Sequence, residues 1–150
     1  MSTRPTYEGF LVFVRGVVGV PDTVVAEGYA TLESCFNSAL ELIPKRIGLE
    51  CLPIIYTNTV YNAAASLMLR YATDSNTSTY FADMRKTLGL NTPMYGLMNA
   101  AADQGTSGSM VISDALSNLS LADLMMMQDP YGRAVVAVLM EMGTLWGYTP

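Results

Sequence analysis

Apolar residues recur every three or four positions along several stretches of this chain, a spacing typical of amphipathic helices. One such stretch starts at Asp22 or Thr31 and runs to Ile43, where Pro44 ends it because a residue before proline disfavours helical geometry. A longer one runs from Pro53 to about Ala72, and its alanines at 63–65 leave room for a close neighbouring helix. These two stretches predict the centre of a helical bundle.

Two further helices are predicted from their end signals. Thr79 opens a short helix, and Gly89 supplies the left-handed residue that commonly closes one. Asp129 is a good N-cap, and Pro130 suits the first helical position of a helix that ends at Gly143. Its apolar stripe consists of Tyr131, Val135, Val138 and Met142.

Other segments are less regular. The stretch Tyr7–Val18 is rich in Val and Phe and fits either a helix or a strand. Glycine and proline recur from 91 to 115, where 103–109 reads as a loop or hairpin tip and 110–112 as a strand paired near 97–101. Ser120 caps another short helix. The predicted fold is therefore mainly α: a single domain over 1–150, with four or five helices, a small β-hairpin and an extended tail at 143–150.

Composition adds a puzzle to this picture. Of 150 residues, 51% are apolar and only 14% are charged, against roughly 25% charged in an average protein. The mean hydropathy is +0.28. A chain so poor in charge exposes much neutral surface, which suggests that other subunits cover part of it.

Several function classes are disfavoured by the residues present. The net charge is −5 and the eight basic residues are scattered, so no nucleic-acid-binding stripe forms. The chain has no histidine, which excludes Ser-His-Asp and Cys-His catalysis and His-bearing zinc sites. Cys35 and Cys51 favour two free buried thiols over a disulfide. No stretch suits a signal peptide or a membrane span, so we expect synthesis in the cytoplasm and no membrane contact.

No motif predicts a catalytic, metal or cofactor site. The pair Gly105 and Gly108 lacks the residues of a phosphate-binding loop, so we interpret it as a loop tip. Glu33 and Glu41 are expected on the solvated face of one helix. The carboxylates form no metal-binding pattern, and Asp129 fits a helix cap better than a ligand.

Two features point instead to contacts between chains. Met125, Met126 and Met127 are consecutive, and three neighbours on a helix cannot all face one core. They fit a fully enclosed core helix and an inter-subunit contact equally well. Leu145, Trp146 and Tyr148 make an aromatic segment that either packs back on its own bundle or docks onto another chain, and we favour docking.

Five stretches together resemble the head–tail connector (adaptor or head-completion) proteins of tailed bacteriophages, over about residues 30–150. They are Pro53-Ile-Ile-Tyr-Thr-Asn-Thr-Val-Tyr-Asn-Ala-Ala, Ala102-Asp-Gln-Gly-Thr-Ser-Gly-Ser, Asn118-Leu-Ser-Leu-Ala-Asp-Leu, Asp129-Pro-Tyr-Gly-Arg and Gly143-Thr-Leu-Trp-Gly. The order of elements is also similar: two long helices, a Gly/Ser-rich hairpin region, a long helix and a tail.

The resemblance implies a structural role without enzymatic activity or cofactor. Such proteins form a ring, commonly twelvefold, beneath the portal and continue the DNA channel toward a downstream tail or nozzle protein. The implied location is the virion neck, after assembly in the host cytoplasm, with DNA only passing through. The portal-docking residues would be Leu145, Trp146, Gly147 and Tyr148.

The same resemblance assigns the hairpin region to contacts with a neighbouring subunit or the next ring. Its residues are Gln104, Gly105, Thr106, Ser107 and Gly108, to which the three methionines at 125–127 are added as interface candidates. Two alternatives stay open. One is another virion ring component, such as a tail terminator or tube protein. The other is a small helical enzyme or ligand-binding subunit.

Overall fold

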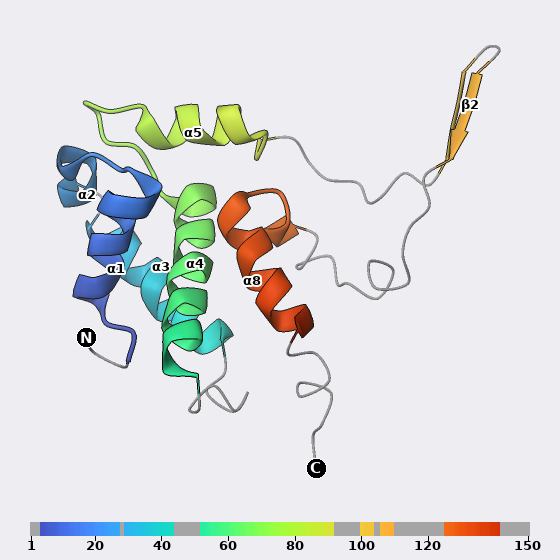
Figure 1. The fold of residues 1–150 in the computed structure, drawn as a ribbon. Coiled ribbons are helices and arrows are strands. Elements are labelled where there is room, and N and C mark those ends of the chain that lie inside the picture. The colour runs from blue at the N-terminus through green and yellow to red at the C-terminus, as the bar shows by residue number, and fades with distance from the viewer. Residues whose placement is uncertain are drawn as a thin grey trace.

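The computed structural model describes residues 4–27, 29–43, 52–91, 100–103, 106–109 and 125–141. Helices dominate these residues, which confirms the mainly α prediction. Figure 1 shows α4 at the centre, with α1 and α3 on one side, α8 on the other, and α5 across one end. The α-helices are α1 (Tyr7–Phe13), α2 (Asp22–Glu27), α3 (Tyr29–Leu42), α4 (Pro53–Tyr71), α5 (Tyr80–Leu88) and α8 (Pro130–Glu141).

The expected number of four or five helices is too low, since the described residues alone contain six α-helices. Part of the difference lies at the N-terminal side, where the pattern left helix and strand open. There α1 continues into a π-helical turn, η1 (Val14–Val18), and Gly19 closes it with φ 80°. Phe10 and Val14, four residues apart, are fully buried, so the helical spacing is what places both in the core.

Helix α4 agrees with its prediction almost to the residue. Pro53 stands in its first turn, where the missing N–H costs nothing. The three alanines at 63–65 are fully buried, and α3 packs closely against this helix. Small side chains let two helix backbones approach, as the sequence predicted. The apolar spacing of Val60, Ala64, Leu67 and Tyr71 predicts a buried stripe, but Tyr71, the last residue of α4, is 63% exposed.

Helix α3 begins at Tyr29, two residues before the proposed start at Thr31. The other proposed start, Asp22, is the first residue of a separate helix, α2. The predicted apolar face is buried at Leu32, Phe36, Ala39 and Ile43. Glu33 and Glu41 are exposed, as expected for the solvated face.

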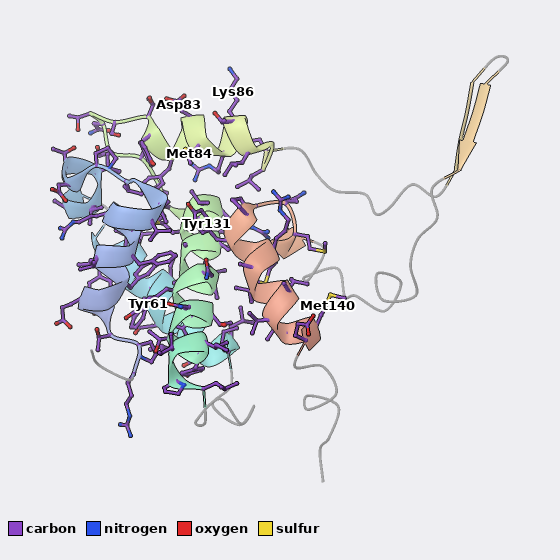
Figure 2. All side chains as sticks on the ribbon, in the orientation of Figure 1. Tyr61, Asp83, Met84, Lys86, Tyr131 and Met140 are labelled. Atoms are coloured by element: carbon purple, nitrogen blue, oxygen red, sulfur yellow. The ribbon has the colours of Figure 1, made fainter. Side chains whose placement is uncertain are left out.

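Helix α5 lies where Thr79 and Gly89 predicted it, but Thr79 does not cap it through its side chain. The carboxylate of Asp74 does so from the preceding loop, accepting from the N–H groups of Phe81 and Ala82 at 2.8 Å each. Figure 2 shows Asp83 and Lys86 pointing away from the bundle and Met84 toward it. Arg85 donates to the carbonyl of Ala72 at 2.6 Å, which ties α5 to the end of α4.

Two short strands, β1 (Ala100–Asp103) and β2 (Thr106–Ser109), pair antiparallel with Ala100 opposite Ser109. Their position differs from the expected one. Residues 106–109, which the glycine pattern assigned to the tip, form a strand here. The expected strand at 110–112 and the helix capped by Ser120 lie outside the described residues.

Candidate functional site

The most distinctive polar group in the structure is the carboxylate of Asp129, which is fully buried at the start of α8. Its Oδ1 accepts from the N–H of Gly132 at 2.7 Å, which makes Asp129 the N-cap that the sequence predicted. Its Oδ2 accepts from Ser66 Oγ at 2.7 Å and from the guanidinium of Arg70 at 3.2 Å, both on α4. One side chain therefore starts α8 and fastens it to α4.

Arg70 neutralises this buried charge. Its side chain is only 12% exposed and forms the salt bridge with Asp129. Its Nε is buried without a hydrogen-bond partner in the described residues, so Asp129 is the acceptor on which the guanidinium depends. A buried ion pair of this kind is costly to break, because removing one member leaves the other charge unpaired.

The residues after Asp129 explain why α8 begins so close to the preceding turn. A Cβ on Gly132 would collide with the backbone carbonyl of Met126, so only glycine fits there. Tyr131 packs edge-on against Phe13 of α1, with ring centroids 6.3 Å apart. Burial, and then the neighbouring Tyr80 and Asp129, raise the pKa of Tyr131. The motif Asp129-Pro-Tyr-Gly thus acts as one docking unit.

No family model, no curated protein and no solved structure matches the chain. The site has to be interpreted from its own residues.

The interface residues predicted from the sequence fall in different places. Met125 is 40% exposed, and Met126 and Met127 are half-buried in the turn before α8. Thr106, Ser107 and Gly108 lie in β2. The remaining candidates lie outside the described residues: Gln104, Gly105, Leu145, Trp146, Gly147 and Tyr148.

A cleft for a small substrate would require polar groups converging from several elements. The structure has a hollow of about 390 Å³ whose lining comes entirely from α3: Ala30, Glu33, Ser34, Asn37, Ser38 and Glu41. Side chains of one helix face diverge rather than converge, so this hollow is an open depression. Over the described parts of the chain, His, Cys, Asp and Glu residues form no cluster able to hold a metal ion.

Cys35 is buried in α3 and free of any disulfide. Burial raises the pKa of its thiol to about 11, which makes it a poor nucleophile. Cys51 lies outside the described residues. Among the helices described, none is both long enough and apolar enough to cross a membrane.

The sequence predicted only one part of the polar connection between α4 and α8. The cap role of Asp129 follows from its place before a proline and an apolar stripe. Its partners Ser66 and Arg70 lie 63 and 59 residues away. One feature of the sequence could have indicated these partners. Ser66 and Arg70 lie four positions apart, and Arg70 is the only charged residue between 53 and 71.

Proposed function

We propose that this chain is a non-catalytic building block of a virion ring, a head–tail connector of a tailed bacteriophage. In this proposal copies of the chain close into a ring beneath the portal, commonly of twelve subunits. The ring continues the DNA channel and offers a platform to a downstream tail or nozzle protein.

The observation that carries the proposal is the docking of α8 on α4 by Asp129. The motif Asp129-Pro-Tyr-Gly-Arg is one of the stretches on which the resemblance rests, and two of its residues have a defined part in that docking. Asp129 bonds α4, and Gly132 leaves space for the Met126 carbonyl. Asp129 fastens the start of α8 to α4, so the helix that precedes the segment 143–150 in the sequence is anchored to the bundle. A docking arm needs such an anchor, because an ordered starting point lowers the entropy lost on binding.

The surface also suits assembly. A ring of identical subunits joins two different faces of each copy. Large apolar side chains are exposed in two places, at Val12 and Val17 on α1 and η1 and at Leu52 and Ile54 at the start of α4. Exposed apolar side chains of this size are typical of surfaces that another chain covers.

The finer assignments follow from the resemblance. Leu145, Trp146, Gly147 and Tyr148 would dock on the portal. The hairpin of β1 and β2 and the methionines at 125–127 would contact a neighbouring subunit or the next ring. The net charge of −5 suits a channel through which DNA slides, since a lining rich in phosphate-binding cations would retard it.

Removal of the segment after Met142 tests the docking role. We expect the truncated chain to keep the helical circular-dichroism spectrum of the full chain and to lose co-sedimentation with purified portal rings. A Trp146→Phe variant serves as the matched control, and we expect it to retain part of the binding because it keeps an aromatic ring. Portal binding by the truncated chain at full strength would contradict the docking role.

The same assay distinguishes a head–tail connector from a tail-terminator or tail-tube ring. Such a component would assemble with tail proteins and leave the portal unbound. If the chain binds neither the portal nor tail proteins, stays monomeric and binds a small ligand, the result would favour a ligand-binding or enzyme subunit.

A further inference from the structure

The helix that begins as α1 ends in the π-helical turn η1, which Gly19 closes in the left-handed region. The N–H of Gly19 donates to the carbonyl of Val14 at 3.0 Å, and the N–H of Val20 donates to the same oxygen at 3.1 Å. In the simplest glycine-closed helix end, the bond from the glycine spans four residues. Here it spans five, so the turn holds one residue more than such an end requires.

The extra residue decides which valines are buried. In a continuous α-helix, Phe10, Val14 and Val17 would share the buried side, at i, i+4 and i+7. Phe10 and Val14 are fully buried, whereas Val17 is 62% exposed. Val20, which follows the closing glycine, is only 2% exposed and belongs to the core. The π-helical turn therefore leaves Val17 in solvent and places Val20 in the core.

An α-helical register of the same residues reverses this choice. The carbonyl of Val14 then accepts from the N–H of Val18, four residues on, and Val17 turns toward the side of Phe10. Val20 loses its bond to that carbonyl and with it its fixed place in the core. Because both exchanged residues are valines, the apolar surface buried at one position is similar to the surface released at the other.

The surroundings of the turn allow such a change. A Cβ at Gly16 or at Gly19 would meet no atom within 4 Å, so no close packing fixes the backbone at these two positions. The salt bridge between Arg15 and Asp22 joins side chains that are 47% and 81% exposed. Exposed ion pairs of this kind contribute little to stability, so this one holds η1 to the start of α2 only weakly.

We propose that η1 is a two-state register switch built into the fold. In the π register, which the structure shows, Val20 is buried and Val17 is exposed. In the α register, Val17 is buried and Val20 is released. The switch changes which apolar side chain the bundle presents to solvent. It operates within a single chain and does not depend on the proposed function.

Nuclear magnetic resonance of the free chain tests the switch directly. Helix register shifts occur in microseconds to milliseconds, which relaxation dispersion detects, so we expect dispersion at the amides of Val17 and Val20. Val17→Glu should abolish it, because a charged side chain cannot enter the buried side and only the π register remains. Val12→Glu is the matched control, since Val12 is 68% exposed in α1, and it should leave the dispersion unchanged.

Deletion of Val17 tests whether the turn holds an extra residue. The deletion places Gly19 four residues after Val14, the spacing of an ordinary glycine-closed end, and keeps Val20 beyond it. We expect a melting temperature within about 3 °C of the unmodified chain and no dispersion. Deletion of Val12 is the control. It turns the following residues by about 100° and takes Val14 out of the core, so the melting temperature should fall by about 10 °C or more.

Four results would overturn the proposal. They are no dispersion in the unmodified chain, dispersion that persists in Val17→Glu, loss of cooperative melting when Val17 is deleted, and dispersion that grows with protein concentration. The last would mean that association between chains, and not a change within one chain, causes the exchange. Since the assays contain no portal, their failure leaves the portal-docking experiment untouched.

Discussion

Helix α4 is held on two sides by contacts of opposite chemistry. Toward α1 and α3 the contact is aromatic. Phe10 and Phe36 stack with centroids 5.7 Å apart, and Tyr61 of α4 lies 6.2 and 6.4 Å from these rings. Ring contacts of this kind are many, tolerant of angle, and individually weak.

Toward α8, one buried carboxylate is added to the apolar packing of Val135 and Leu139. Asp129 makes its hydrogen bonds to Ser66, Arg70 and Gly132 within 3.2 Å, and it is wholly removed from water. Such bonds are directional, and a buried group that loses its partner keeps the full cost of desolvation.

The two sides of α4 are therefore expected to respond differently to substitution. The aromatic side spreads its stability over several rings, so small changes are absorbed. The α8 side combines apolar packing with one buried ion pair, so the loss of Asp129 alone should loosen α8. Substitutions at three positions and one labelling reaction test this difference.

The largest loss of stability is expected when a large aromatic side chain is truncated on the side of α4 that faces α1 and α3. Phe10→Ala should lower the free energy of unfolding by about 4 kcal/mol, because it leaves a cavity among fully buried groups. Phe10→Leu should cost only about 1 kcal/mol, since another apolar group can repack there. Urea unfolding measures both. Equal losses for Leu and Ala would show that this side is as exacting as the α8 side.

On the α8 side even a near-isosteric change should be costly. Asp129→Ala should lower the free energy of unfolding by about 3 kcal/mol, because Arg70 is left buried and unpaired. Asp129→Asn keeps the acceptor for Gly132 but loses the charge, and we expect about half that loss. Hydrogen exchange should show α8 opening while α3 and α4 stay protected. An Asn variant as stable as the unmodified chain would mean that the ion pair contributes nothing.

Gly132→Ala tests the close approach of α8 to the turn before it. The added Cβ meets the carbonyl of Met126, and the backbone must move, so we expect a loss of about 2 kcal/mol. Gly16→Ala is the control, since a Cβ there meets nothing within 4 Å. Thermal melts that shift equally for both variants would contradict the tight docking.

The smallest effect concerns Cys35, which should be inert. Near pH 8 in a Cys51→Ser background, iodoacetamide should label it only after unfolding, because it is buried and its pKa is raised from 9.0 to about 11. The unfolded thiol ionises first, so stability should be constant below pH 9 and fall as the pH rises from 9 to about 11. Rapid labelling of the native protein would place Cys35 at the surface.

The sequence predicted local features better than contacts between distant residues. Pro53 and the alanines of α4, Gly89 after α5, and Asp129-Pro130 before α8 each act through their immediate neighbours, and the structure confirms them. The Asp74 cap was missed because it lies seven residues before the N–H that it bonds. The Ser66–Asp129 contact was missed because it exists only once α8 has packed on α4. Residues 106–109 were predicted to form the hairpin tip but form a strand. Glycine and serine favour turns, and the sequence does not show whether a strand includes them.

The claim that this chain is a ring-forming connector is tested most directly by electron microscopy of the purified full chain mixed with portal rings. We predict a second ring that is coaxial with the portal. Every particle should carry a ring with the same number of subunits. Portal rings that stay bare while the chain remains monomeric at every concentration would contradict the claim.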